Sequence, residues 1–190
     1  MSTNTTKNAI SMALRELVKE KPLNRITIGE IADRASINRQ TFYYHFQDII
    51  DLVRWMLSTE AGRQIEGNRT YDTWQKGYLA VFRTIESDRQ FILNIYHHIP
   101  RQYLMDYLYS VTMNLLLDVV REKTRDLGVR VREEDIDFIA NFFKYSLVGI
   151  VLDWIDHDME EDAGKIVSRL DSIIHGTIEK ALSNAAKKRF

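Results

Sequence analysis

The scarcity of helix-breaking residues is the feature that most constrains how this chain folds. Its 190 residues contain only two prolines, Pro22 and Pro100. Proline lacks a backbone donor and disrupts the interior of a helix, so the stretches between these positions are free to be helical. Apolar residues recur at helical spacing through most of the chain, and no stretch of convincing length alternates as a half-buried strand would. We therefore predict an all-α fold.

Capping signals place the first helices. The opening helix ends at Lys21, because the residue before Pro22 avoids the helical region of backbone conformation. Thr27 and Glu30 form a capping-box pattern at the start of a short second helix. After a tight turn, Asn38 is a good N-cap for a third. Two short helices joined in this way are typical of a helix-turn-helix.

The rest of the chain continues as longer helices. Asp48 caps the fourth, and the polar stretch 63–70 is the best candidate for a loop. Residues 87–90, Ser-Asp-Arg-Gln, suggest another capping box, and Gly128 is placed to end a helix. The further helices are expected at about 72–86, 88–97, 101–126, 133–156 and 161–186.

The composition excludes several classes of protein. The chain has no cysteine, which removes disulfides, zinc fingers, iron–sulfur clusters and thiol catalysis. The polar N-terminus lacks the apolar core of a signal peptide, and no apolar run approaches the ~18 residues of a membrane span, so we expect a cytoplasmic protein. Phosphate-binding loops, dinucleotide glycine fingerprints, nucleophile elbows and HExxH motifs are missing as well. We therefore expect neither an enzyme nor a cofactor.

The charge is unevenly distributed along the chain, although the net charge is only −1. Residues 1–47 hold seven Lys or Arg and four Asp or Glu, a net charge of +3, which leaves −4 for the remainder. This asymmetry predicts a small, positively charged N-terminal domain at 1–47 and a larger, acidic helical domain at 48–190.

The third helix has the side chains of a DNA-reading helix. Phe42 and Phe46 fall on its inner face. Its outer face has no acidic residue and carries Arg39, Gln40, Tyr43, Tyr44 and Gln47. Arginine pairs with guanine and glutamine with adenine in the major groove, while tyrosine contacts a thymine methyl or a phosphate. The alternative is a helical hairpin whose aromatic face packs against the rest of the protein. Thr27 would offer its hydroxyl to a phosphate.

The run from Thr27 to Phe46, TIGEIADRASINRQTFYYHF, resembles the signature of the TetR family of bacterial transcription regulators. The resemblance implies a three-helix DNA-binding domain joined to a helical ligand and dimerisation domain, and a dimeric repressor released from a palindromic operator by a small molecule. By matched position, it implies backbone contacts from Thr27, Thr41, Tyr43 and His45. It implies base contacts from Arg39, Gln40 and Tyr44.

Two positions depart from the family pattern. Ser36 occupies a turn position that is usually glycine, and a left-handed serine costs about 1 kcal/mol. Ile49 stands where the family favours a phosphate-contacting lysine, a role that Lys7 or Arg25 could assume.

A narrower resemblance gives an alternative function. Residues 38–55 and 148–154 are similar to a TetR subgroup that includes activators of dihydroxyacetone kinase operons. In that subgroup a kinase-like protein relays the signal. The alternative to the small-molecule-released repressor is therefore an activator controlled by a protein coactivator.

The last two expected helices are too apolar to be left in water. The resemblance implies that they pair with those of a second subunit in a four-helix bundle, whereas a monomer would bury both stripes internally. The predicted interface residues are Phe143, Leu147, Val151, Ile155, Leu170, Ile174 and Ile178.

Aromatic residues in the middle of the chain could line an effector pocket, although at this spacing such residues are more often core. The predicted pocket residues are Trp55, Phe82, Phe91, Tyr96, Tyr107 and Phe142. The neighbours His97 and His98, and the pair Asp153 and His157, lack a third metal ligand, so we expect no metal site.

Overall fold

The computed structural model of this chain describes residues 3–65, 70–71 and 73–187, and these residues form helices without any strand. They divide into two compact units. The N-terminal unit is Met1–Glu60 with Asp88–Tyr107, and the C-terminal unit is Ala61–Ser87 with Leu108–Phe190. The elements in chain order are α1 (Thr3–Glu20), η1 (Leu23–Arg25), α2 (Ile28–Arg34), α3 (Arg39–His45), α4 (Ile49–Ile65), α5 (Trp74–Ser87), α6 (Arg89–His98), α7 (Arg101–Asp126), α8 (Glu133–Asp156), α9 (Ala163–Ile174) and α10 (Thr177–Lys187).

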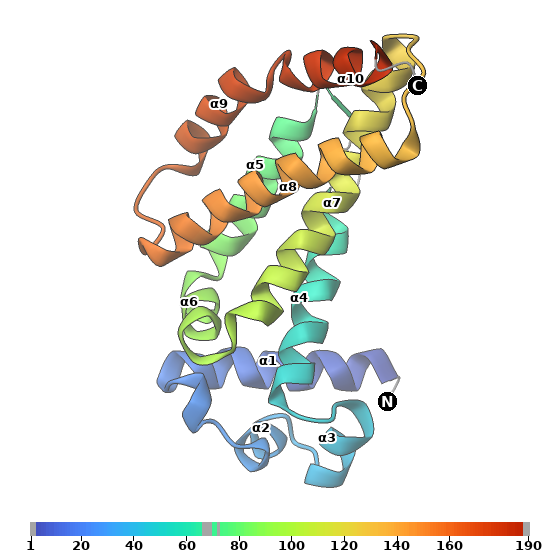
Figure 1. The fold of residues 1–190 in the computed structure, drawn as a ribbon. Helices are drawn as coiled ribbons and strands as arrows, with labels where there is room; N and C mark the ends of the chain where they lie inside the picture. Colours follow the sequence, from blue (N-terminus) through green and yellow to red (C-terminus); the bar gives the residue numbers. More distant parts are fainter. Residues whose placement is uncertain (1–2, 66–69, 72, 188–190) are drawn as a thin grey trace. The chain divides into compact units, whose positions relative to one another are not determined.

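The N-terminal unit is organised around α1, drawn in blue in Figure 1. Helices α2 and α6 both pack on α1, and α3 packs on α2. The α1 residues Ile10 and Leu14 are fully buried, as are Ile31 of α2 and Phe42 of α3. Burial of this apolar surface is the main stabilising contribution to such a small core.

Helix α6 belongs to this unit although it lies some seventy residues after α1 in the sequence. The side-chain oxygen of Asn94 accepts a hydrogen bond from the Leu23 amide (2.7 Å), and its amide group donates to the Val18 carbonyl (3.3 Å). Arg15 of α1 pairs with Asp88 just before α6. The compact units therefore do not follow the predicted division at residue 47, because a later helix returns to cover α1.

The C-terminal unit is held together by an aromatic cluster between α5 and α8. The hydroxyl of the buried Tyr78 donates to the carbonyl of Leu147, 2.7 Å away. The Phe82 ring lies 4.8 Å, centroid to centroid, from that of Trp154. Helix α9 packs on α5, and α10 packs on α8.

Most of the predicted helix boundaries are confirmed. The caps at Thr27, Asn38 and Asp48 each accept a hydrogen bond from the third residue beyond them. Gly128 adopts the left-handed conformation expected after α7, with φ +61°. Local rules suffice here because each cap is satisfied within one turn.

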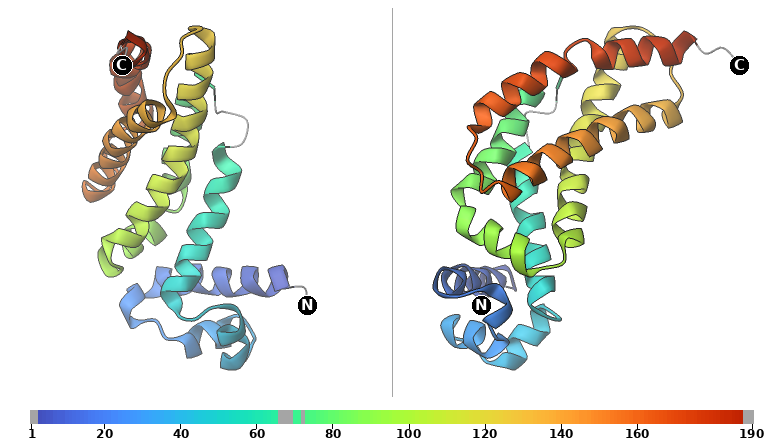
Figure 2. Two further views of the ribbon diagram at one scale, coloured as in Figure 1. Left: turned by 45° about the vertical axis from the view of Figure 1, so that its right-hand side comes forward. Right: turned by 60° about the vertical axis from the view of Figure 1, so that its left-hand side comes forward.

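Three expectations were wrong or fall partly outside the described residues. The capping box predicted at 87–90 does not form, because Ser87 is the last residue of α5 and its hydroxyl donates to the Thr84 carbonyl. Asp88, at the start of α6, makes no side-chain cap either, and its carboxylate pairs with Arg15. The last expected helix is broken into α9 and α10, a bend visible in Figure 2, where Gly176 adopts φ +79° and donates its amide to the Tyr71 hydroxyl (3.3 Å). Helix α4 continues to Ile65, so the predicted loop 63–70 begins later, and residues 66–69 lie outside the described part.

Helix α8 alone among the described helices is long and apolar enough to cross a membrane, judged by length and composition. Half of its apolar window is buried inside the chain, as in the core helix of a globular protein. Its acidic first turn, Glu133 to Asp135, suits the positive end of a helix dipole.

Candidate nucleic-acid interface

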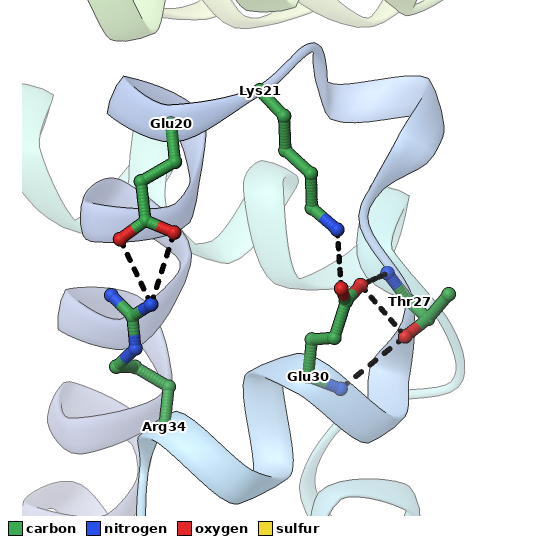
Figure 3. Close-up of polar contacts among 5 residues, drawn as sticks. All are labelled: Glu20, Lys21, Thr27, Glu30 and Arg34. Carbon is green, nitrogen blue, oxygen red and sulfur yellow. Dashed lines mark hydrogen bonds and ion pairs between the residues drawn. The ribbon is translucent and has the colours of Figure 1, made fainter.

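The start of α2 is fixed by a complete capping box, drawn in Figure 3. The Thr27 hydroxyl oxygen accepts a hydrogen bond from the Glu30 amide (3.3 Å). In return, Glu30 Oε2 accepts from the Thr27 amide and from its hydroxyl, both at 2.9 Å. These reciprocal bonds satisfy backbone donors that a helix start otherwise leaves open.

Ion pairs tie α2 to α1 on either side of this cap. Lys21, just after α1, pairs with Oε1 of Glu30. Arg34 at the end of α2 donates to both carboxylate oxygens of Glu20 (2.9 and 3.1 Å) and to Glu16 (3.2 Å), and the Glu20 contact is seen in Figure 3. The hydrogen bond from Lys21, with those from Thr27, lowers the pKa of Glu30 to about 2. The orientation of α2 is therefore set by charged contacts as well as by its apolar face.

The turn between α2 and α3 is a Schellman motif with serine in the glycine position. The Ile37 amide donates to the Ala32 carbonyl (2.9 Å), and the Ser36 amide donates to the Asp33 carbonyl (3.2 Å). Ser36 has φ +54°, in the left-handed region, as its place in the turn requires. The departure from glycine is therefore accommodated without changing the turn, at the expense of some strain.

Helix α3 has a buried side and an exposed side. Phe42 is fully buried and Phe46 nearly so. On the opposite side Tyr44 is 81% exposed and Tyr43 is 58% exposed. The exposed side also includes Arg39 and Gln40, whereas Gln47, predicted on the same face, is exposed but lies beyond the end of α3, because the backbone becomes extended at Phe46. The alternative in which this aromatic face packs against the rest of the protein is therefore wrong, because Tyr43 and Tyr44 are exposed.

The residues predicted to contact the DNA backbone differ in whether their hydrogen-bond donors are already used within the protein. The Thr41 hydroxyl donates to Oδ1 of the cap residue Asn38 (2.9 Å), and the Thr27 hydroxyl donates to Glu30. A phosphate oxygen can only accept, so both hydroxyls would have to rotate to reach it. Tyr43 is exposed, and His45 is half-buried. Both threonines act within the free protein as helix-start residues.

Lys7 contacts two aromatic rings near the start of α4, the helix that begins with Ile49. Its ammonium group lies 5.2 Å from the centre of the Phe46 ring and 5.5 Å from that of Trp55. These cation–π contacts hold a positive charge where α3 ends and α4 has begun. The predicted pocket residue Trp55 thus packs against the DNA-binding segment.

The remaining predicted pocket residues are divided between the two units. Phe91 lies in the core of the N-terminal unit, where Arg15 stacks on its ring, and Tyr96 contacts Arg101. Tyr107 is half-buried in the same unit. In the C-terminal unit, Phe82 is fully buried, whereas Phe142 is 61% exposed on α8.

The residues predicted for the dimer interface all lie inside the single chain. Each has at most 8% of its surface exposed. The single chain therefore already buries these seven side chains and leaves little of their surface for a partner subunit. They are Phe143, Leu147, Val151, Ile155, Leu170, Ile174 and Ile178. The exposed apolar residues of the same helices are Phe138, Phe142 and Tyr145 on α8 and Ile173 on α9.

A hollow of about 440 Å³ lies between α8 and α9, beside Ile150, Trp154 and Ile173. Its rim includes Arg169 paired with Glu161. None of the six predicted pocket residues lines this hollow.

The histidines weighed as metal ligands make local contacts. His157 Nδ1 lies 2.8 Å from the Asp153 carbonyl oxygen, a contact that raises the pKa of its imidazole, and His98 Nδ1 lies 2.9 Å from the Asn94 carbonyl oxygen. Within the described residues, no three His, Cys, Asp or Glu side chains are grouped to hold a metal ion.

Two family models match this chain. The model described as "Bacterial regulatory proteins, tetR family" matches residues 10–54, and the one described as "Transcriptional regulator C-terminal region" (TetR_C_8) matches residues 72–176. The first covers the capping box, the turn and α3, and the second covers more than half of the chain.

Individual proteins are similar over different lengths. The HTH-type dhaKLM operon transcriptional activator DhaS of Lactococcus lactis subsp. lactis (strain IL1403) is 29% identical over 91 residues, which is 48% of this chain and 49%, about half, of that protein. The solved structure of a dihydroxyacetone kinase operon activator DhaS has a TM-score of 0.73 at 21% identity, covering 92% of this chain and 97% of that one. The fatty acid degradation regulator FadR from Bacillus halodurans has a TM-score of 0.67 at 16% identity, covering 90% and 95%. At these identities the structural likeness concerns the fold.

Proposed function

This chain belongs to the tetR family of bacterial regulatory proteins and is a transcriptional regulator, and we propose that it binds a palindromic DNA operator as a dimer through α3. Regulators of this family bind DNA and are transcription factors, so the proposal concerns which residues make the contacts, how two chains pair, and what controls binding.

The exposed side of α3 is the observation that carries the proposal. Arg39, Gln40, Tyr43 and Tyr44 form a solvent-facing set with no carboxylate among them. Gln40 and Tyr44 would read base edges, and Arg39 would read guanine at the start of the helix. Tyr43 and His45 would donate to phosphates, and Lys7 would supply the charge that Ile49 lacks.

The dimer would form through the exposed apolar face of α8 and α9. Phe138, Phe142 and Tyr145 follow one another at helical spacing on α8, and Ile173 is exposed on α9. Aromatic side chains left in water in this number are typical of a protein interface. One reading helix binds DNA weakly, and a two-fold dimer presents two of them to half-sites about one helical turn apart.

An effector bound by the C-terminal unit would control DNA binding by preferring one of two conformations of the dimer. For a small molecule, the chain would be a repressor released from its operator. The sequence similarity to the dhaKLM operon transcriptional activator favours a second candidate, a transcriptional activator that responds to a protein coactivator. Cytoplasmic location follows from either role.

Selection from a random pool of double-stranded oligonucleotides tests the DNA-binding proposal. We expect enrichment of a two-fold symmetric sequence whose half-sites are separated by about one helical turn, ~34–36 Å, or a multiple of it. A protein in which Gln40 and Tyr44 are both replaced by alanine is the control, and it should enrich no sequence. Failure of the wild-type protein to enrich any sequence contradicts the proposal.

The sign of regulation needs a different measurement. Transcription in vitro from a promoter containing the selected site should fall when the protein is added, if it is a repressor. It should rise if the chain is an activator, and then only with its coactivator present. Metabolites that release the protein from DNA in the absence of any second protein would favour the first candidate.

A further inference from the structure

The guanidinium of Arg39 lies against Gly29, at the point where α2 and α3 come together. A Cβ atom added to Gly29 would lie 2.5 Å from an Arg39 terminal nitrogen and 3.1 Å from both Cζ and Nε. Non-bonded carbon and nitrogen atoms do not approach to 2.5 Å, so the guanidinium occupies space that any other residue would take. Gly29 is itself buried, although it lies in the first turn of α2.

The contact holds the side chain but leaves its donors available. Within the described part of the chain, no carboxylate or carbonyl accepts a hydrogen bond from the Arg39 guanidinium, and Arg39 as a residue is exposed. Arg34, by contrast, donates hydrogen bonds to Glu16 and Glu20. A guanidinium carries five donors in a fixed planar fork, which suits paired recognition of the acceptor edge of guanine.

We propose that Gly29 is a specificity-determining position, because it holds the Arg39 guanidinium in place for contact with a DNA base. Because Gly29 has no side chain, the guanidinium packs directly against its Cα; we call this contact the seat. Arg39 therefore loses less conformational freedom on binding a base than an arginine that is not held in this way. This inference rests on the proposed function, in which α3 reads an operator and Arg39 contacts a base. A side chain at position 29 would unseat Arg39 without disturbing the fold, because the atoms that must move are the far end of a flexible side chain.

Four full-length proteins test this seat: wild type, Gly29→Ala, Arg39→Ala and the double variant. Their affinities are measured for the selected operator and for a scrambled duplex, at one salt concentration. We expect Arg39→Ala to weaken operator binding roughly tenfold to a hundredfold. Gly29→Ala should weaken it roughly threefold to tenfold, and the double variant should bind like Arg39→Ala alone. Binding to the scrambled duplex should stay within about twofold for Gly29→Ala.

Gly164→Ala is the matched control. Gly164 is likewise the second residue of a helix whose first turn is capped by a side chain, that of Asp162, and its added Cβ would meet only Oδ1 of that residue, at 3.1 Å. Operator affinity should be unchanged in this variant. The melting temperature of Gly29→Ala should equal or exceed that of the wild type, because alanine favours a helix more than glycine.

Three results would overturn the inference alone and leave the proposed function intact. If Gly29→Ala binds the operator as tightly as the wild type, the seat has no effect. If the two losses multiply in the double variant, the added methyl group acts directly on DNA and not through Arg39. If Gly29→Ala weakens all DNA equally, position 29 does not determine specificity. An Arg39→Ala protein that binds the operator normally would instead refute the base contact of the proposed function, and the inference with it.

Discussion

Both units of this chain expose aromatic side chains, but in different chemical surroundings. On α3, Tyr43 and Tyr44 stand beside Arg39 and Gln40, so each ring is accompanied by groups that donate hydrogen bonds. On α8 the exposed rings include Phe138 and Phe142, which have no polar atom.

The difference indicates what each surface is suited to bind. A tyrosine, arginine and glutamine surface keeps its polar groups hydrated until phosphates and base edges replace the water. A phenylalanine surface contributes favourable free energy only when water is excluded from it, as in a subunit interface. Exposed aromatic rings alone therefore do not indicate a DNA-binding surface. The polar side chains beside those rings are what indicates it.

A charge on the α8 face should have the largest effect. We expect Phe142→Glu to convert the proposed dimer to monomers, because an unpaired carboxylate would be buried in the proposed interface. Operator affinity should fall roughly a hundredfold or more, since the two reading helices would no longer bind as one unit. Sedimentation equilibrium and operator titration measure both effects. Leu127→Glu, at an exposed apolar position near the end of α7, is the control. A Phe142→Glu protein that is still dimeric would show that the exposed face of α8 is not the subunit interface.

The α3 surface should respond through sequence discrimination. Gln40→Ala should weaken binding to the selected operator roughly fivefold to a hundredfold, because glutamine makes paired hydrogen bonds to adenine. Binding to a scrambled duplex should change by less than about twofold. Gln102→Ala, which removes an exposed amide of α7, is the control and should alter neither affinity. Equal loss on both duplexes would mean that Gln40 does not read a base.

A buried tyrosine in the C-terminal unit gives a smaller effect on stability. Tyr78→Phe removes the hydroxyl that donates to the Leu147 carbonyl, and we expect the free energy of unfolding to fall by about 1 to 2 kcal/mol. Burial raises the pKa of Tyr78, so its hydroxyl stays protonated throughout the usual range of such measurements. Urea unfolding gives the difference. Tyr109→Phe, at a half-buried position, is the control. An equal loss of unfolding free energy in that variant would show that the hydrogen bond of Tyr78 contributes no extra stability.

The smallest effect concerns the charge on Glu30. Since its pKa is lowered to about 2, its ionised form stabilises the fold above its ordinary pKa of 4.5, and this contribution is lost as the pH falls from 4.5 through 2. The difference in melting temperature between the wild type and Glu30→Gln should be constant above pH 5 and shrink at lower pH. Glutamine can still complete the capping box, so the comparison isolates the charge. Glu86→Gln, on the exposed side of α5, supplies the baseline, and a difference that does not vary with pH contradicts the assignment.

Sequence patterns predicted the features that depend on neighbours within a few residues. The caps at Thr27 and Asn38 and the left-handed glycine at Gly128 each require only the adjacent turn. The family signature around α3 is also contiguous, and its exposed face followed from helical spacing alone. These features account for α3 and most of the fold.

Features that depend on distant partners could not be predicted in the same way. Residues 87–90 have the sequence pattern of a capping box, but Asp88 pairs instead with Arg15, which is 73 positions away. Helix α8 is apolar on more than one face, so its pattern could not separate Leu147, which is buried in the chain, from Phe142, which is exposed. The contact between Gly29 and Arg39 likewise exists only after the turn at Ser36 brings α2 and α3 together.

The two hydrogen bonds of Asn94 have a consequence for how far this protein is modular. They join α6 to the end of α1 and to η1, and Ile92 and Ile95 of the same helix are buried. A fragment cut after the fourth helix would lack these groups and would expose apolar surface on α1. A chimaera that exchanges DNA specificity between two such regulators should therefore carry the partner's α6 with its first sixty residues. The transferable module is discontinuous in the gene although it is continuous in space.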